Sequence, residues 1–234
     1  MRSRPHVRRR EFLRIAGGAL AVSALTGHLQ RAAVDAAEGD QRPASRDPGQ
    51  LRRLLSEMEA SGGQYWSVPR KDGEFLHLLV KATRAKQVLE LGTSHGYSAI
   101  WVGLALEETG GRLTTIEINA TRHDLARRHV SEAGLAQRVT LIKGDAHVEV
   151  TRLDGPFDFV FLDAEKEGQV DYFNKLYPKK LAPGGMLAVH NAIHQASVMK
   201  DYLDMIRKHP DFDTVTVSAT MDDGLCLSYR RRGA

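Results

Sequence analysis

A glycine turn, residues 91–97, follows a hydrophobic run and has residue types that suit ligand binding. Gly92 and Gly96 let the chain turn sharply and let a ligand approach the backbone closely. Their spacing is G-x-x-x-G, unlike the G-x-G-x-x-G of dinucleotide enzymes, and Glu90 precedes the first glycine by two residues. Because such a turn can be purely structural, it predicts a ligand site only together with other signals.

Polar segments also end the next two hydrophobic runs. Glu117 ends the second run, where a carboxylate can accept hydrogen bonds from both hydroxyls of a ribose. Gly144-Asp145-Ala146 ends the third run, beside the place that an adenine ring would take. A lone glutamate is usually solvated, but three such features at successive strand ends predict a nucleoside-binding crevice.

The hydrophobic runs predict alternating strands and helices. Runs rich in β-branched and aromatic residues predict strands at residues 87–91, 113–118, 139–142, 157–162 and 186–189. Helical spacing predicts helices between them at residues 97–108, 121–133, 146–152 and 169–181. This alternation is typical of βαβ units and a parallel sheet, in which ligands bind beyond the carboxyl ends of the strands.

The two ends of the pattern differ from its middle. Before the first strand, Asp72 is expected to cap a helix that follows a shorter one beginning at Leu51. Near the carboxyl end, residues 214–219 and 225–230 are strands joined by a turn too short for a crossover helix, so they must run antiparallel. The expected fold is therefore α/β: a Rossmann-like seven-stranded sheet, mostly parallel with an antiparallel last strand, and helices on both faces.

Several segments of the chain resemble one family of enzymes. They read VLELGTSHGYSAIW, EAGL, GDA, FDFVFLDAEKEG, YFNKLYPKKLAPGG and DGL, and they span about residues 65–230. Together they resemble the class I S-adenosylmethionine-dependent methyltransferases and, among these, the cation-dependent family of catechol and caffeoyl-CoA O-methyltransferases. The sheet of that class ends in an antiparallel hairpin of the kind expected here.

The resemblance implies which residues hold S-adenosylmethionine. In the family, the acid and glycines of the first motif bind the methionine part, the acid after the second strand binds the ribose, and the G-D-A segment meets the adenine. Carried onto this sequence, these roles and their neighbouring contacts fall on Ser67, Glu90, Gly92, Thr93, Gly96, Ser98, Glu117, Asp145, Ala146 and Asp163.

The resemblance also implies a divalent cation. The family holds it with an aspartate after the fourth strand and an Asp-Asn pair after the fifth, which correspond to Asp163 and to His190 with Asn191. Mg²⁺ prefers oxygen ligands, whereas Mn²⁺, Fe²⁺ or Zn²⁺ tolerates imidazole better, so the histidine predicts a changed metal preference or no bound metal. Alternatively, His190 only ends a strand and holds Asn191 in place. His194 is expected in a solvated loop.

Methyl transfer requires mainly positioning and the removal of a proton. A nucleophilic oxygen must lie close to the methyl group along the S–CH₃ axis, and a phenol must lose its proton, which a bound cation favours. The resemblance places the base at Lys166, three residues after Asp163, and makes these two the catalytic pair. Without the resemblance, Lys166 would be a surface lysine in a charged turn. Tyr65 and Trp66 are candidates for the wall of an acceptor pocket.

The composition describes a globular chain with a separate basic leader. The 234 residues are 42% hydrophobic and 26% charged, and the formal net charge is +4. Residues 1–36 hold seven arginines against two acidic residues, so the remainder, at −1, gives no electrostatic reason to expect nucleic acid. Cys226 is the single cysteine, which excludes an intrachain disulfide framework and a cysteine-rich zinc site.

The leader has the layout of a secretory signal. An arginine-rich segment, an apolar segment at residues 15–27 and small residues at 32–37 follow one another, and RREFLR at 9–14 resembles the twin-arginine pattern. The alternative is a basic amphipathic helix at the edge of the domain. We expect a twin-arginine signal peptide at 1–36, a linker at 37–49 and a methyltransferase domain at 50–234. The protein would be periplasmic or extracellular, or tethered to a membrane by an uncleaved leader.

These patterns predict an enzyme that moves a methyl group from S-adenosylmethionine to a hydroxyl of a small, catechol-like aromatic acceptor, with help from a cation such as Mg²⁺ or Mn²⁺. Similar bacterial enzymes are often dimers, so a homodimer is compatible with the resemblance. A different interpretation is an exported binding or scaffold protein that keeps the fold without catalysis, because S-adenosylmethionine is made inside cells. A nicotinamide-dependent oxidoreductase is disfavoured by the glycine spacing and the terminal hairpin.

Overall fold

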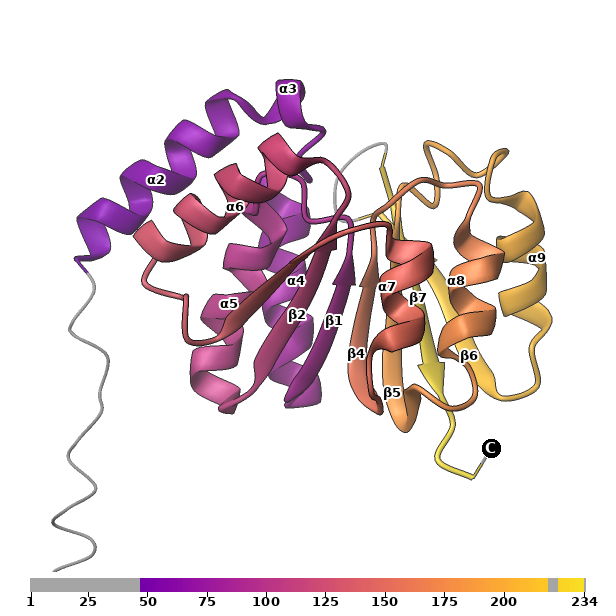
Figure 1. Cartoon of the computed structure of the whole chain (residues 1–234). Coiled ribbons are helices and arrows are strands. Elements are labelled where there is room, and N and C mark those ends of the chain that lie inside the picture. Colours follow the sequence, from indigo (N-terminus) through magenta and orange to yellow (C-terminus); the bar gives the residue numbers. More distant parts are fainter. Residues whose placement is uncertain (1–46, 219–222, 234) are drawn as a thin grey trace, which may run out of the picture. The chain divides into compact units, whose positions relative to one another are not determined.

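The computed structural model describes residues 47–218 and 223–233, which form a mixed sheet covered by helices (Figure 1). The strands are β1 Gln87–Leu91, β2 Arg112–Glu117, β3 Val139–Lys143, β4 Phe157–Leu162, β5 Leu181–His190, β6 Phe212–Val217 and β7 Leu225–Arg230. Their order is β3-β2-β1-β4-β5-β7-β6. Strands β1 to β5 pair in parallel, whereas β7 runs antiparallel to both β5 and β6. The predicted seven-stranded α/β fold with its terminal hairpin is confirmed.

The strand order reverses beside β1. The chain moves outward from β1 to β2 and β3, and then returns to the other side of β1 with β4 and β5. Such a reversal leaves a crevice outside the carboxyl ends of the central strands. The Gly92 N–H donates to the Ile116 carbonyl at 3.0 Å, and the Asp163 N–H donates to the Leu91 carbonyl at 2.8 Å. These bonds hold the strand ends that carry predicted site residues side by side.

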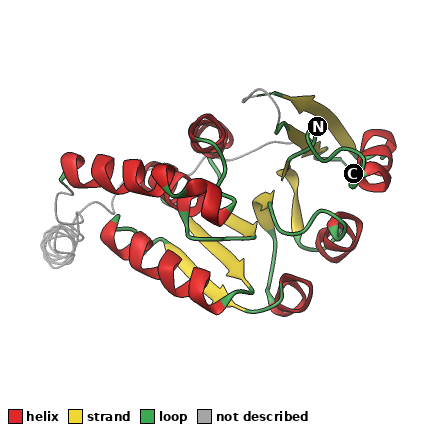
Figure 2. Cartoon of the chain, turned by 90° about the horizontal axis from the view of Figure 1, so that it is seen from above, coloured by secondary structure: helices red, strands yellow, loops and turns green. Residues whose placement is uncertain are grey.

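Helices cover both faces of the sheet, as the view from above shows (Figure 2). They are α2 Pro48–Ala60, α3 Gly62–Tyr65, α4 Arg70–Thr83, α5 Tyr97–Thr109, α6 Ala120–Glu132, α7 Ala146–Arg152, α8 Gln169–Leu176 and α9 Lys200–Lys208. Side chains of α2, α4, α5 and α6 share one hydrophobic cluster, and those of α7, α8 and α9 share another. Because both faces are covered, the central strands read as continuous hydrophobic runs rather than alternating ones.

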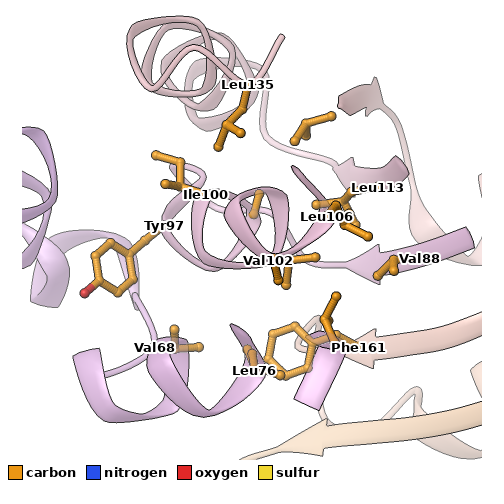
Figure 3. Close-up of a cluster of buried hydrophobic side chains, with 14 of the residues drawn as sticks. Val68, Leu76, Val88, Tyr97, Ile100, Val102, Leu106, Leu113, Leu135 and Phe161 are labelled. Atoms are coloured by element: carbon orange, nitrogen blue, oxygen red, sulfur yellow. The ribbon is translucent and has the colours of Figure 1, made fainter. Parts of the chain in front are cut away.

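The core around α5 supports the glycine turn from which this helix begins. Ile100, Val102 and Leu106 of α5 are completely buried. Figure 3 shows them gathered with side chains of the neighbouring elements, such as Val88 of β1 and Leu76 of α4. Burying one aliphatic side chain of this size contributes about 1.5–3 kcal/mol, so this core holds the start of α5 firmly.

Some element boundaries differ from the sequence expectation. Helix α8 ends at Leu176 rather than at residue 181, because Pro178 cannot continue a helix and disfavours helical backbone at the residue before it. Strand β5 begins at Leu181 rather than at residue 186, and its register against β4 is irregular at Phe157. Helix α2 begins inside the expected linker, because Asp47 caps it through the Gly49 N–H.

Within the described part of the chain, no helix combines the length and the apolar character needed to cross a bilayer. The predicted signal peptide at residues 1–36, and most of the expected linker, lie outside the described residues. Export therefore stays a prediction from the sequence.

Candidate active site

A pocket of about 890 Å³ lies at the carboxyl ends of the central strands. Its volume is within the range of small-molecule and cofactor sites. The predicted site residues on its wall are Ser67, Gly92, Glu117, Asp145, Ala146, Asp163, Lys166, His190 and Asn191. The glycine turn, the ends of β2 and β3, and the segments after β4 and β5 therefore meet in one place.

Glu117 orders the turns on the β1–β3 side of the pocket. Its Oε2 accepts from the Ser94 N–H at 2.8 Å, and its Oε1 accepts from the Asn119 N–H at 2.9 Å and from Arg122 Nε at 3.2 Å. The side chain is 5% exposed and lines the pocket. These three hydrogen bonds fix Glu117 in position, and because each carboxylate oxygen has two lone pairs, Oε2 keeps capacity for one more hydrogen bond, from a ribose hydroxyl.

The turn after β3 presents the start of α7 to the pocket. Asp145 caps this helix, because its Oδ1 accepts from the His147 N–H at 2.8 Å, and Ala146 is the first helical residue. Both Asp145 and Ala146 line the pocket. The capping bond uses one oxygen of the carboxylate, and it fixes this side chain at the place that the sequence analysis gives to the adenine.

Further residues assigned to S-adenosylmethionine, namely Glu90, Thr93, Gly96 and Ser98, lie behind the pocket wall rather than on it. Glu90 is completely buried, and burial raises its pKa to about 7. Thr115 donates to Glu90 Oε2 at 2.5 Å, and the hydroxyls of Ser98 and Thr115 partly offset the effect of burial on this pKa. These residues shape the glycine turn, and their contact with the nucleoside stays a prediction.

Gly92 allows the ends of β1 and β4 to approach each other. Its φ is +96°, and a Cβ built on it would lie 2.5 Å from the Asp163 carbonyl oxygen. Gly96 has a φ of +95°, and a Cβ there would lie 3.2 Å from Ala126 of α6. A larger residue at Gly92 would therefore push the Asp163 segment away from the turn.

Left-handed backbone at non-glycine residues gathers at this pocket. Trp66, Ser94 and Asn191 have φ values of 51°, 49° and 60°, and all three line the pocket. Such a conformation costs on the order of 1 kcal/mol or more and persists only where the surroundings impose it. Its concentration around one pocket indicates a backbone that is shaped for function.

A row of alternating charges, the charge row Lys166–Asp163–His190–Asp72, lies at the β4–β5 side of the pocket. Lys166 Nζ is 2.7 Å from Asp163 Oδ1, and the same oxygen is 3.1 Å from His190 Nδ1. His190 Nε2 is 2.9 Å from Asp72 Oδ2. Helix α4, the segment after β4 and the end of β5 thus contribute to one connected set of ionisable groups.

The structure corrects the expectation for Asp72. The N-cap residue of α4 is Pro69, and Asp72 lies in the first turn with its side chain completely buried against His190. Asp223, just before β7, adds a further carboxylate: its Oδ2 is 3.9 Å from His190 Nε2, and its Oδ1 accepts from Asn191 Nδ2 at 2.9 Å. His190 is therefore surrounded by carboxylates from three separate segments of the chain.

The charge row sets the protonation of its own members. Burial alone lowers the pKa of His190, but the carboxylates of Asp163 and Asp72 outweigh burial and raise this pKa to about 9. Burial alone raises the pKa of Asp163, but the cationic groups of Lys166 and His190 hold it below its usual value. At neutral pH the row accordingly contains an imidazolium between carboxylates.

These side chains, as arranged, do not fit the divalent cation that the resemblance implies. Histidine binds a metal through a ring nitrogen that carries no hydrogen, whereas both nitrogens of His190 face carboxylate oxygens at hydrogen-bond distance. Asp163 Oδ1 already accepts from Lys166, and the Asn191 amide donates to Asp223. Hydrogen bonds among the side chains thus engage both nitrogens of His190 and one oxygen of Asp163.

Aromatic rings border the pocket. Tyr65 and Trp66 line it, as the sequence suggested, and Trp66 is 78% exposed. The Arg122 guanidinium lies 5.1 Å from the centroid of the Trp66 ring, and the Tyr65 ring stacks on His95 with 4.8 Å between centroids. Since a tryptophan exposed beside a pocket offers a flat apolar face, an aromatic acceptor can stack on this wall.

Part of the site lies outside the residues that were predicted from the sequence. The wall residues outside that prediction include Ser94, Arg122, Glu165, Tyr172, Gln195 and Asp223. Asp223 lies in the quoted segment DGL, so a signal for it existed, whereas Asp72 is separated by 118 positions from its partner His190 and has no local signal. His194 is exposed, as expected, and lies on the pocket rim.

Sequence comparisons place the chain among methyltransferases. A sequence model of the O-methyltransferase family matches residues 42–223. A catechol O-methyltransferase of Mycobacterium tuberculosis is 32% identical over 201 residues, which are 79% of this chain and 90% of that protein. A catechol O-methyltransferase of Niastella koreensis is 36% identical over 140 residues, which are 58% of this chain and 62% of that protein.

Solved structures share the fold. The O-methyltransferase from Bacillus cereus in complex with S-adenosylhomocysteine is 26% identical. Its superposition on this chain has a TM-score of 0.70 and covers 85% of this chain and 97% of that one. TomG, an O-methyltransferase of tomaymycin synthesis from Streptomyces achromogenes in complex with S-adenosylmethionine, is 26% identical, with a TM-score of 0.68 over 85% and 96% of the two chains.

Proposed function

Because this chain belongs to the O-methyltransferase family and is an S-adenosylmethionine-dependent methyltransferase, we propose that its acceptor is a hydroxyl of a small, catechol-like aromatic molecule. The observation that carries the proposal is that Glu117 and the Lys166–Asp163 pair lie on the wall of the same pocket. The similarity to two catechol O-methyltransferases supports the acceptor class.

The β1–β3 side of the pocket suits the nucleoside. Glu117 would accept a hydrogen bond from the ribose, and Asp145 with Ala146 would meet the adenine. The glycine turn, at Gly92, would carry the methionine part. S-adenosylmethionine and S-adenosylhomocysteine in the similar solved structures support this assignment.

The β4–β5 side suits the acceptor. The charge row lies on this side, while Tyr65 and Trp66, beside the glycine turn and Arg122, offer aromatic surface on the same pocket. Lys166 and His190 are its cationic members, but both nitrogens of His190 are engaged by carboxylates. The Lys166 ammonium therefore is the group that would contact the acceptor oxygen.

The reaction balances with groups on this wall. The acceptor oxygen attacks the methyl carbon along the S–CH₃ axis, so that an O–C bond forms while the C–S bond breaks and the sulfonium becomes a neutral thioether. The Lys166 ammonium would first release a proton to solvent; the neutral amine would then take the phenolic proton, and Asp163 would hold the ammonium that forms again. The products are a methyl ether, S-adenosylhomocysteine and a proton that returns to solvent.

Binding and turnover measurements test the proposal. Purified protein is titrated calorimetrically with S-adenosylhomocysteine and then given S-adenosylmethionine with catechol, a monophenol or an aliphatic diol. We expect saturable nucleoside binding, methylation that is fastest on catechol, and none on the diol, whose hydroxyls are far less acidic. Equal rates on catechol and the diol would contradict the acceptor class, and absent nucleoside binding would contradict the activity itself.

We also propose that the protein acts outside the cytoplasm. The support is the pair Arg9-Arg10 with the apolar and small residues that follow it, together with a family match that begins only at residue 42. A reporter fused to residues 1–40 should be exported, and replacing Arg9-Arg10 with Lys-Lys should stop its export. Export that persists in the Lys-Lys variant would refute the twin-arginine assignment.

A further inference from the structure

We infer that this methyltransferase works without a divalent cation, because the charge row occupies the place of that cation and supplies positive charge from its own side chains. The inference rests on the proposed function, since it concerns how the same site activates its acceptor. Of the alternatives that the sequence left open at Asp163, His190 and Asn191, a changed metal preference or no bound metal, it selects the second.

His190 is the residue that closes the site to a metal. It stands where the resemblance expects an aspartate, and it is 4% exposed. Its Nδ1 lies 3.1 Å from Asp163 Oδ1 and its Nε2 lies 2.9 Å from Asp72 Oδ2. Because ionised carboxylates only accept hydrogen bonds, each ring nitrogen must carry a hydrogen, and the ring then has no lone pair for a metal.

The charges of the row are balanced without an ion. Asp72 is completely buried, and a buried carboxylate is costly unless a cation or hydrogen bonds compensate it. Two cationic groups, on Lys166 and His190, face the two carboxylates of Asp72 and Asp163. A divalent cation added beside the imidazolium and the ammonium would meet like charge, which disfavours its binding.

A second set of groups could receive an ion. Asp72, His190 and Asp223 present ligand atoms within 4.8 Å of one another. His190 Nε2 would have to lose its hydrogen there and would then face Asp72 with a lone pair. Asp72 does not line the pocket, but His190 and Asp223 do, so an ion held by this set would lie at the pocket wall. Metal uptake at this set is an outcome that the experiment below detects.

Without a bound cation, Lys166 and His190 have different roles in the reaction. Lys166 lines the pocket and can contact the acceptor oxygen directly, which makes it a catalytic residue of the proposed reaction. His190 acts through Asp163 and is a positioning residue, because its hydrogen bond fixes the carboxylate that holds Lys166.

The experiment measures metal binding by the full chain. Wild-type protein purified without chelator is analysed for Mg, Mn, Fe and Zn by mass spectrometry, and is then titrated with Mn²⁺ under electron paramagnetic resonance. We expect no stoichiometric metal, no saturable Mn²⁺ uptake, and an affinity for S-adenosylhomocysteine that EDTA leaves unchanged. One bound ion per chain, or a rate that falls about tenfold or more in EDTA, would overturn the inference.

One variant is expected to bind the metal that the wild-type protein does not bind. His190→Asp restores the carboxylate of the family pattern, so it should take up one Mn²⁺ per chain and gain thermal stability when Mn²⁺ is added. His194→Asp is the matched control, since it adds the same carboxylate to an exposed position on the pocket rim and should bind no Mn²⁺.

Each outcome of the variant experiment is decisive. A folded His190→Asp protein without Mn²⁺ uptake, or equal uptake by His194→Asp, would show that His190 is not what closes the site. If His190→Asp does not fold, the wild-type titration still decides the inference. Failure of the proposed function has another signature: no phenol is methylated, whatever the metal content.

Discussion

The two sides of the pocket are built differently. On the β1–β3 side, backbone turns form the pocket wall. The Glu117 carboxylate links the glycine turn to the turn after β2, because it accepts from the N–H groups of Ser94 and Asn119. On the β4–β5 side, side chains form the pocket wall. There the charge row connects segments that are far apart in the sequence, such as those of Asp72 and His190.

The difference separates what the family shares from what this chain changes. A site made by backbone at successive strand ends keeps its form while side chains around it vary, because strand pairing holds it. A site made by ion pairs among side chains can be rebuilt by one substitution, since the remaining charges rearrange around the new group. His190 is such a substitution relative to the pattern that the resemblance implies.

The largest effect is expected for Lys166→Ala on the acceptor side. Removal of a general base typically costs 10²–10⁴-fold in rate, so kcat should fall by about that factor while the dissociation constant of S-adenosylhomocysteine stays within about threefold. Asp163→Ala should behave similarly. Steady-state kinetics with catechol and calorimetry check this, and full activity in both variants would show that the acceptor reacts elsewhere.

The next effect concerns stability rather than rate. His190→Leu removes the imidazolium that lies between the carboxylates of Asp72 and Asp163, and breaking a buried ion pair costs about 3–5 kcal/mol of unfolding free energy. Asp72→Asn combined with His190→Leu should be more stable than His190→Leu alone, because one buried charge is removed as well. Urea denaturation measures both, and an unchanged midpoint in His190→Leu would refute the charge row as a stabilising unit.

On the β1–β3 side, Glu117→Gln should weaken nucleoside binding. Hydrogen bonds to a charged group contribute about 1.5–3 kcal/mol, so the dissociation constant of S-adenosylhomocysteine should rise roughly tenfold to a hundredfold, with kcat at saturation nearly unchanged. The exposed Glu132→Gln of α6 is the control for charge alone. A loss of kcat without a loss of affinity would contradict the assignment of nucleoside binding to the β1–β3 side and of the acceptor to the β4–β5 side.

The smallest effect is a pH dependence of stability from His95, in the glycine turn. Burial, with help from the nearby His129, lowers its pKa from 6.5 to about 4. Between these values the unfolded chain binds a proton that the folded chain does not, so stability falls as the pH falls, by about 2 kcal/mol from pH 6.5 to 5.

His95→Phe keeps the stacking with Tyr65 and removes this titration, so its unfolding free energy should depend less on pH than that of the wild type. Denaturation at both pH values measures the difference, and His194→Gln, at an exposed position, serves as the control. Parallel pH curves for wild type and His95→Phe would rule out His95 as the source.

The sequence predicted the fold and the β1–β3 side better than the acceptor side, for a physical reason. Strand and helix periods, the glycine turn and Glu117 are local features, so neighbouring residues reveal them. Burial of Asp72 against His190 depends on how α4 packs beside the end of β5, which no local pattern shows. Local patterns therefore predicted a capping role for Asp72, and they left open whether His190 binds a metal or only ends a strand.

The start of β5 shows the same limit. The strand was expected at residues 186–189, yet it begins at Leu181, because Leu181 pairs with Phe157 of β4.

The central claim, methyl transfer to a phenolic oxygen in this pocket, is tested most directly by following a labelled methyl group. Wild-type protein is incubated with S-adenosylmethionine that carries a trideuterated methyl group and with catechol, and the products are analysed by mass spectrometry. The account predicts a catechol methyl ether with one intact trideuterated methyl on oxygen and an equal amount of S-adenosylhomocysteine. Unlabelled catechol with no S-adenosylhomocysteine formed, from protein that is folded, would contradict it.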